Sequence, residues 1–218
     1  MGTLVESLAP AHGFDVVGVY DINNNPDGQA LAEAPNADVA VDFSAASAVP
    51  INVPVLARRG INMVLGTTGW QEQEPLLRRF VSEAGIGIVA ASNFSLGANL
   101  FQSLVEHAAR QFQHRGEYGA WIYEAHHATK KDAPSGTALT LRTAMEAAGY
   151  LRRIDIAATR AGSIPGTHTV GFDGPSDTVT LTHTNRDRAA FALGAFEAAR
   201  WVIGKRGWFT MKDVLGID

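Results

Sequence analysis

Residues 61–90 read INMVLGTTGWQEQEPLLRRFVSEAGIGIVA, and this stretch decides the fold class. It begins with the apolar run Ile61–Leu65 and ends with a second apolar run, Ile86–Ala90, both of a length typical of buried strands. Between them, Gln71–Glu83 has the apolar spacing of a helix. Strands that are apolar throughout and alternate with helices are typical of a parallel sheet covered on both faces. The stretch therefore predicts part of an α/β domain.

The same alternation extends toward the N-terminus. Further strands are expected over Phe14–Tyr20 and Asp38–Phe43, and a further helix over Ala45–Arg58. Together these elements predict a Rossmann-like, doubly wound parallel sheet of the nucleotide-binding kind. Thr3–Ala11 has helical spacing and precedes a strand, so the chain is expected to start inside the first crossover helix, with the first strand missing.

The pattern changes after an expected helix over Leu96–Gln113. The strands expected beyond it are separated by turn residues and one helix: Tyr118–Glu124, Ile154–Arg160, Thr169–Phe172 and Thr178–His183. This pattern predicts a second, α+β domain. The helix expected over Arg188–Ile203 is strongly apolar, so it should return to pack on the first domain. We therefore predict a dinucleotide-binding domain of residues 1–96 plus 188–218, and a substrate-binding and oligomerisation domain of residues 97–187.

The composition excludes several classes of protein. With 46% hydrophobic and 18% charged residues, the chain of 218 residues is globular rather than disordered. A net charge of −4 and the absence of any Lys/Arg run longer than two residues argue against a nucleic-acid partner. The sequence contains no cysteine, no secretion signal and no apolar run near the ~18 residues of a membrane span. We therefore expect no membrane partner and a cytoplasmic location.

The segment Glu124–Thr137, EAHHATKKDAPSGT, has the densest set of side chains able to do chemistry. It lies between an expected strand and an expected helix start, where Ser135 is a plausible N-cap. Gly136 and Thr137 would then present N–H and hydroxyl donors at the positive end of the helix dipole. Such an arrangement suits a carboxylate ligand.

The basic side chains of this segment suggest proton chemistry. His126 and His127 can give or take a proton near neutral pH, and the ammonium group of Lys130 can stabilise developing negative charge. Three other interpretations remain open: a solvated loop with a capping serine, a metal site, and a serine hydrolase with Ser135 as nucleophile. Adjacent histidines seldom point the same way and no complete ligand set accompanies them, so no metal is expected. Ala-Pro-Ser-Gly also lacks the two-glycine elbow of a hydrolase.

Two tetrapeptides follow expected strands directly: Gly66-Thr67-Thr68-Gly69 and Ala91-Ser92-Asn93-Phe94. Both fall at the carboxyl ends of parallel strands, where open α/β sheets bind ligands, and small residues let the backbone approach a nicotinamide ribose. Asp21, after the strand expected over Phe14–Tyr20, could accept the adenine-ribose hydroxyls. Each of these residues could equally belong to an ordinary turn.

Five motifs, taken in order, resemble those of the dihydrodipicolinate reductase family, also called 4-hydroxy-tetrahydrodipicolinate reductases. They are Val41-Asp42-Phe43-Ser44, Gly66–Gly69, Ser92-Asn93-Phe94-Ser95, Glu124–Thr137 and the tail Gly207–Gly216. The resemblance runs from about Gly2 to the C-terminus, and the run from the paired histidines to Thr137 is highly specific. It implies reduction of 4-hydroxy-tetrahydrodipicolinate to tetrahydrodipicolinate by NADH or NADPH in diaminopimelate and lysine biosynthesis. It also implies a homotetramer joined through the sheets of the second domain.

The resemblance further implies roles for individual residues. His126 would be the proton donor, Lys130 its catalytic partner, and His127, Gly136 and Thr137 would bind the substrate, a small dicarboxylate. The implied cofactor-binding residues are Asp21 at the adenosine ribose, Gly66, Thr67 and Thr68 at the nicotinamide end, the turn residues Ala91, Ser92, Asn93 and Phe94, and Arg188 near the interdomain hinge.

The sequence departs from the family pattern in places that concern the cofactor. The family opens with a strand and a Gly-x-x-Gly-x-x-Gly turn, whereas Met1-Gly2 matches only the last glycine, so we expect an incomplete cofactor site. A misplaced start codon or a shortened chain would explain this. Ala45 and Ile22 stand where basic residues could hold a 2′-phosphate, which favours NADH over NADPH.

Two alternative functions remain open at this point. One is a catalytically silent or truncated relative that binds dicarboxylates without turnover. The other is a reductase of the same architecture that acts on another imine or aldehyde.

Overall fold

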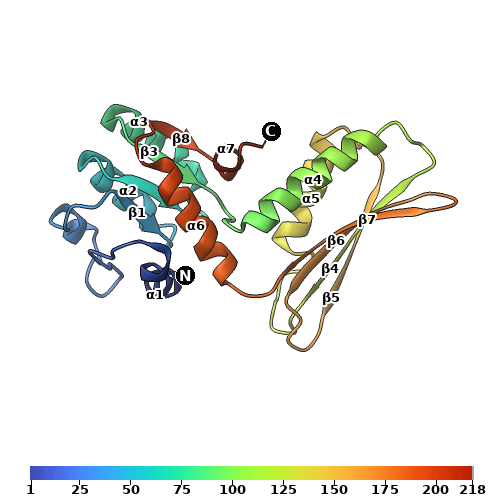
Figure 1. Ribbon diagram of the computed structural model, residues 1–218, viewed down its shortest axis with the longest axis horizontal. Helices are drawn as coiled ribbons and strands as arrows, with labels where there is room; N and C mark the ends of the chain where they lie inside the picture. The colour runs from blue at the N-terminus through green and yellow to red at the C-terminus, as the bar shows by residue number, and fades with distance from the viewer. Residues whose placement is uncertain (218) are drawn as a thin grey trace. The chain divides into compact units, whose positions relative to one another are not determined.

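The computed structural model describes residues 1–217, which form two compact units (Figure 1). One unit comprises Met1–Leu96 together with the chain from Ala189 onward, and the other comprises Gly97–Arg188. No helix among the described residues is both long and apolar enough to cross a membrane.

The first unit is built on a parallel sheet with the strand order β1-β2-β3-β8. Its strands are β1 (Val39–Asp42), β2 (Asn62–Leu65), β3 (Gly87–Ala90) and β8 (Gly207–Phe209). The sheet and its helical connections confirm the predicted α/β class. The sequence reasoning assigned no strand to β8, which is only three residues long.

Helices cover both faces of this sheet, and side-chain alternation along the strands explains why. In β2, Met63 and Leu65 belong to the core shared with α2 (Val49–Arg58) and α3 (Glu74–Ala84). Val64, between them, points to the opposite face and packs in the core formed with α6 (Ala189–Val202). Because successive strand residues face opposite sides, a strand covered on both sides is apolar at most positions.

Shorter elements complete the first unit. They are α1 (Gly2–Leu8), the 3-10 helices η1 (Pro10–His12), η2 (Gln29–Ala32) and η3 (Gln71–Gln73), and α7 (Met211–Leu215). The helix expected over Thr3–Ala11 ends earlier than predicted, at Leu8, because Pro10 has no N–H with which to continue it. The helix expected from Ala45 begins only at Val49, with a proline in its first turn.

The predicted buried strand over Phe14–Tyr20 is wrong. These residues have no regular secondary structure, and Val16, Val17 and Val19 are 44%, 51% and 46% exposed. The sheet ends at β1, and no strand of the described chain pairs with the segment. A β-prone sequence becomes a strand only where a neighbour supplies hydrogen-bond partners and a face to pack on.

The second unit combines a mixed sheet with two helices. Its elements are α4 (Leu96–Phe112), β4 (Gly119–His126), α5 (Gly136–Ala147), β5 (Ile154–Arg160), β6 (Gly166–Asp173) and β7 (Thr178–Asn185). The strand order is β5-β4-β6-β7, with β4 parallel to β5 and antiparallel to β6, and β6 antiparallel to β7. This arrangement confirms the predicted α+β character. The parallel pair requires a crossover, which α5 provides.

Within residues 1–217, helices cover one face of this second sheet and leave the other uncovered. Ile122, Val170 and Phe172 pack with residues of α4 and α5 in a single core. On the other face, threonine hydroxyls pair across β6 and β7, Thr167 with Thr184 and Thr169 with Thr182. This threonine-rich face is open to solvent in the single chain.

Candidate active site

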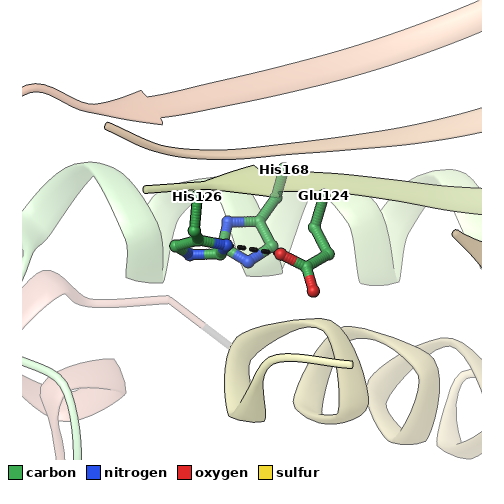
Figure 2. A group of neighbouring side chains, drawn as sticks. All are labelled: Glu124, His126 and His168. Carbon is green, nitrogen blue, oxygen red and sulfur yellow. Dashed lines mark hydrogen bonds and ion pairs between the residues drawn. The ribbon is translucent and has the colours of Figure 1, made fainter. Parts of the chain in front are cut away.

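The densest group of ionisable side chains lies where β4 ends and α5 begins. Glu124 and His126 are two residues apart at the end of β4, so both point to the helix-covered face of the sheet. His168, on β6, lies opposite Glu124 in the pairing of β4 with β6 and points the same way. Figure 2 shows the three side chains gathered together, with Glu124 reaching His126.

Glu124 is fully buried, and both of its carboxylate oxygens are occupied by donors. Oε1 accepts hydrogen bonds from the Ser135 N–H at 3.0 Å and from Arg160 Nη2 at 2.7 Å. Oε2 accepts one from Arg160 Nη1 at 2.8 Å and forms a short hydrogen bond with His126 Nδ1. Burial raises the pKa of Glu124, but the hydrogen bonds from Arg160, Ser135 and His126 outweigh it and hold the pKa below its ordinary value. Glu124 is therefore a carboxylate at neutral pH.

The pKa of His126 is also displaced downward. Burial lowers it, and this effect outweighs the opposing attraction of the Glu124 carboxylate. The ring is thus mainly neutral at pH 7 in the free protein. Its side chain remains 12% exposed, so a ligand can reach it.

Ser135 links the site to α5. Its Oγ accepts a hydrogen bond from the Ala138 N–H at 3.2 Å, which confirms the predicted N-cap. The same Oγ lies 2.9 Å from His168 Nε2. His168 is 4% exposed, and burial lowers its pKa to about 4, so this histidine is neutral near pH 7.

The predicted carboxylate-binding donors surround the start of α5. Lys130 Nζ lies 2.8 Å and 2.9 Å from the two carboxylate oxygens of Asp132. The hydrogen bond from Lys130 lowers the pKa of Asp132, and the N–H of Gly136 lowers it further. Gly136 is exposed and Thr137 is partly exposed at the first turn of the helix. In the free protein the Asp132 carboxylate thus interacts with Lys130 and the Gly136 N–H, two donors that could also bind a carboxylate of a ligand.

The second histidine of the pair points elsewhere. His127 is exposed, and its Nδ1 lies 2.6 Å from Thr129 Oγ1 within the same loop. Adjacent residues at the end of a strand face opposite sides, which explains why His126 enters the buried cluster and His127 does not.

Glu124, His126 and His168 could also be considered as metal ligands, because their ligand atoms lie within 4.8 Å of one another. However, the guanidinium of Arg160 already binds both oxygens of Glu124. A cation at this position would have to displace a positive group from a buried carboxylate, which is unfavourable. We therefore describe the cluster as a hydrogen-bond network.

The first unit carries the two predicted cofactor turns on adjacent parallel strands, β2 and β3. Thr68 and Gly69 are exposed there, whereas the Thr67 side chain is buried and donates to Asp42 Oδ1 at 2.8 Å. Gly66 is required for packing, because a Cβ there would lie 2.1 Å from the ring of Phe43. Thr68 and Gly69 are therefore accessible to a ligand, whereas Gly66 and Thr67 hold the turn against the rest of the unit.

The second turn divides in the same manner. Ser92 is exposed and Ala91 partly so, whereas the ring of Phe94 is buried in the core with α6. Asn93 Oδ1 accepts a hydrogen bond from the Ser95 N–H at 2.8 Å, just before α4 begins. The exposed residues of both turns fit an extended ligand lying along the carboxyl edge of the sheet, as a dinucleotide does.

The two remaining predicted cofactor residues are both exposed. Asp21 Oδ1 accepts a hydrogen bond from the Asn23 N–H at 2.8 Å, and this bond lowers the pKa of Asp21. The carboxylate therefore already has a role in a local turn. Arg188 is exposed in the segment directly before α6.

Three residues that sequence reasoning left without a role belong to the cluster: Glu124, Arg160 and His168. The spacing of Glu124 and His126 on a strand was a usable signal, because residues i and i+2 share a face. Arg160 and His168 gave no such signal, since their approach depends on the register of β5 and β6 against β4.

Two family models match the chain, described as dihydrodipicolinate reductase, N-terminus, over residues 1–94 and dihydrodipicolinate reductase, C-terminus, over residues 97–215. A 4-hydroxy-tetrahydrodipicolinate reductase from Methanoregula boonei is 38% identical, over 94% of this chain and 83% of the relative. One from Methanospirillum hungatei is 36% identical, over 100% of this chain and 95% of the relative.

Solved structures show the same fold. A dipicolinate-bound dihydrodipicolinate reductase from Paenisporosarcina sp. TG-14 superposes with a TM-score of 0.83 at 20% identity, covering 96% of this chain and 92% of that one. An amine dehydrogenase from Mycobacterium smegmatis superposes with a TM-score of 0.61 at 11% identity, covering 96% of this chain and 91% of that one. At these identities the likeness concerns the fold.

Proposed function

This chain belongs to the dihydrodipicolinate reductase family, and on that premise we propose that it reduces 4-hydroxy-tetrahydrodipicolinate to tetrahydrodipicolinate in diaminopimelate and lysine biosynthesis. The observation that carries the proposal is His126, a partly exposed histidine held by a buried carboxylate beside a helix N-terminus and Lys130. The site thus combines a proton donor with donors for an anionic substrate.

His126 supplies the proton and Lys130 stabilises the charge that develops as it is transferred. A substrate carboxylate binds the N–H groups of Gly136 and Thr137 and the Lys130 ammonium, with a further contact from His127. These donors stand at the positive end of α5, which favours an anion. The dipicolinate bound by the Paenisporosarcina relative is a dicarboxylate, which supports the same substrate class here.

The family consists of NAD(P)H-dependent reductases, and the bound nicotinamide supplies the hydride. In this chain Gly66, Thr67 and Thr68 would line the nicotinamide end, and the Ala91–Phe94 turn would add further contacts. Asp21 would accept the adenosine-ribose hydroxyls, and Arg188 would lie near the cofactor. Residues 1–96 with 188–218 thus form the proposed dinucleotide-binding domain, and residues 97–187 the proposed substrate domain.

We propose that NADH is preferred to NADPH. Ile22 is 74% exposed directly after Asp21, so the position next to the proposed ribose acceptor offers no positive charge to a 2′-phosphate. Fluorescence titration with each nucleotide measures the two dissociation constants. A clearly lower constant for NADPH would refute the preference.

The proposed activity is tested by replacing the proton donor. His126→Gln should lower kcat by about 10²- to 10⁴-fold while changing the dissociation constant of dipicolinate little, because a general acid acts mainly in the transition state. His114→Gln, at an exposed histidine of the same unit, is the control and should leave kcat unchanged.

The alternative of a silent relative predicts a different set of results. Such a protein would bind dipicolinate, but the parent chain would show no turnover with either nucleotide, and His126→Gln would change nothing measurable. Titration with NADH separates the causes, because loss of nucleotide binding in a folded protein would place the defect in the first unit.

A further inference from the structure

Three residues of the second unit surround the imidazole ring of His126, one on β4 and two on β6. Glu124 bonds its Nδ1 from the same strand (Figure 2). The ring of His168 meets it edge to face, with ring centroids 5.1 Å apart and planes at 73°. Gly166 lies close to the other ring nitrogen, because a Cβ built on it would be only 3.0 Å from His126 Nε2.

From this geometry we propose that Glu124, Arg160 and Gly166 are positioning residues that hold His126 as the Nδ1–H tautomer and leave Nε2 as the nitrogen that exchanges the proton. The delivery of that proton to substrate rests on the proposed function. The tautomer itself is a property of the folded chain and does not depend on turnover.

The Glu124 carboxylate determines which ring nitrogen carries the hydrogen. A carboxylate can only accept, so its short contact with Nδ1 requires a hydrogen on Nδ1. The three other donors to this carboxylate, the Ser135 N–H and both Nη groups of Arg160, cannot exchange roles with it. Glu124 is therefore an acceptor toward His126 in every arrangement of this network.

Arg160 has two effects on this pairing. Its bidentate contact fixes the plane of the carboxylate, and its Nη2 also donates to the Asp132 backbone carbonyl at 2.5 Å, which ties the network to the loop before α5. The positive charge of the Arg160 guanidinium also offsets the negative charge of the Glu124 carboxylate. An unpaired buried carboxylate beside the ring would favour the doubly protonated ring. Because Arg160 pairs with Glu124, the ring is held in place and can still lose its Nε2 proton.

Gly166 keeps the Nε2 side of the ring clear. It is the first residue of β6, and its backbone conformation is one that other residues also adopt, so glycine is not required there for its torsion angles. A side chain at this position would press on Nε2 and on Cδ2, 3.0 Å and 3.2 Å from the added carbon. The absence of a Cβ therefore leaves room for His126 itself.

The proton balance follows from this arrangement. In the cationic ring both nitrogens carry hydrogen; transfer of the Nε2 proton to the substrate leaves a neutral ring with its Nδ1–H still bonded to Glu124. A bound nicotinamide would supply the hydride, and the 4-hydroxyl group of the substrate would leave as water. Solvent returns a proton to Nε2 when the next substrate binds. The groups that face the ring through this cycle are Glu124 on β4, Arg160 on β5, His168 on β6 and Lys130 on the loop.

Solid-state ¹⁵N NMR of protein labelled at the histidine ring nitrogens tests the tautomer directly. At a pH where His126 is neutral, we expect a protonated Nδ1 and a bare Nε2, with the signals assigned by their loss in His126→Gln. A bare Nδ1 with a protonated Nε2 would overturn the proposal whether or not the chain turns over substrate. The expected tautomer in a chain without turnover would leave the positioning intact and reject the proposed activity instead.

Gly166→Ala separates positioning from folding. We expect the ring signals of His126 to shift and kcat to fall at least about tenfold, while the dissociation constant of dipicolinate stays within about twofold. Gly119→Ala is the matched control, because it is also the first residue of a strand in this sheet and a Cβ there meets nothing within 4 Å. Unchanged ring signals and kcat in Gly166→Ala would show that the close approach does not position His126.

Glu124→Gln tests the tautomer from the other side. A glutamine amide can present either its oxygen or its NH2 group to Nδ1, so we expect the two tautomers of His126 to coexist in the NMR spectrum and kcat to fall. If this variant does not fold, because Arg160 is left with an unpaired charge, Gly166→Ala still decides the proposal. A folded Glu124→Gln protein that keeps the pure Nδ1–H tautomer would show that another group sets it.

Discussion

At the scale of single residues, the site depends on one buried carboxylate. Glu124 is fully buried, yet it costs the fold little because every lone-pair direction it offers is used by a donor. The arrangement is sensitive to loss of any partner, since breaking a buried ion pair leaves an uncompensated charge worth ~3–5 kcal/mol. Loss of Arg160 should therefore disrupt the site even though Arg160 is not among the proposed substrate-binding residues.

His168 should make the stability of the protein depend on pH. Its pKa in the folded chain is about 4, below the ordinary value of 6.5, so between these values the unfolded chain binds more protons. The free energy of unfolding must then decrease as the pH falls from 6.5 toward 4, by about 2 kcal/mol at most between pH 7 and pH 5 for this one group. Urea unfolding at the two pH values measures the change.

The variant His168→Gln isolates this contribution. Glutamine reaches Ser135 Oγ with an amide but cannot take up a proton, so the difference between pH 7 and pH 5 should shrink relative to the parent chain. His126 and His183 also have lowered pKa values, so they should account for the pH dependence of stability that remains in this variant. Identical pH dependences in variant and parent would show that His168 does not titrate in this window.

His126 should take up a proton when a dicarboxylate binds. In the free protein burial holds its pKa below 6.5, so the ring is mainly neutral at pH 7. Two ligand carboxylates nearby favour the charged ring and raise that pKa. Calorimetric titration with dipicolinate at pH 7, in buffers of different ionisation enthalpy, should reveal uptake of a fraction of a proton per site. His126→Gln should abolish it; uptake that persists there would assign the proton to another group.

At the scale of elements, the site is a product of one β-α-β unit within a mostly antiparallel sheet. The crossover from β4 through α5 to β5 brings a strand end, a helix N-terminus and a second strand end to one place. Carboxyl ends of parallel strands and N-termini of helices both attract anions and catalytic groups. The same principle places the two proposed cofactor turns at the ends of β2 and β3.

Helix α6 supports the second of these turns through an unusually close approach. A Cβ on Gly194 would lie 1.6 Å from the carbonyl oxygen of Phe94, so the helix can pack there only with glycine. We predict that Gly194→Ala destabilises the protein by ~1–3 kcal/mol through overpacking, although alanine is the better helix former. Thermal unfolding measures the effect.

Gly2→Ala is the control for this substitution. It also replaces a helical glycine, in α1, but a Cβ there meets nothing within 4 Å, so its midpoint should equal or slightly exceed that of the parent. A Gly194→Ala protein with a raised midpoint would show that Phe94 moves aside at no cost.

At the scale of the whole molecule, the open face of the second sheet is the proposed contact between subunits of a homotetramer. Tyr123 is 39% exposed on this face, and its hydroxyl donates a hydrogen bond to Thr159 Oγ1 on the neighbouring strand at 2.9 Å. A sheet face that no helix covers can pack against the same face of a second copy. Light scattering should therefore give a mass near four times the 23.2 kDa of one chain.

Tyr123→Glu should lower that mass, because four copies would bring like charges into a desolvated interface. Ile203→Glu, at a residue 49% exposed in the first unit, should leave it unchanged. A parent chain that is monomeric at micromolar concentration, or a Tyr123→Glu protein of unchanged mass, would reject this face as the interface.

The class of both units can be predicted from the sequence, because it follows from local patterns. Apolar runs of strand length alternating with helical spacing required a parallel sheet covered on both faces, and Ser135 was recognisable as a helix cap from its neighbours. The dense run from His126 to Thr137 marked the region of the candidate site for the same reason. The family was also evident from these motifs.

The tertiary structure alone decided which side chains meet. Arg160 and His168 reach Glu124 because strand register aligns residues 36 and 44 positions away from it, and no local pattern encodes register. The segment Phe14–Tyr20 shows the converse, since its β propensity is real but no strand among residues 1–217 pairs with it. Propensity is a property of a few neighbouring residues, whereas pairing and burial depend on partners that only the folded chain brings into contact.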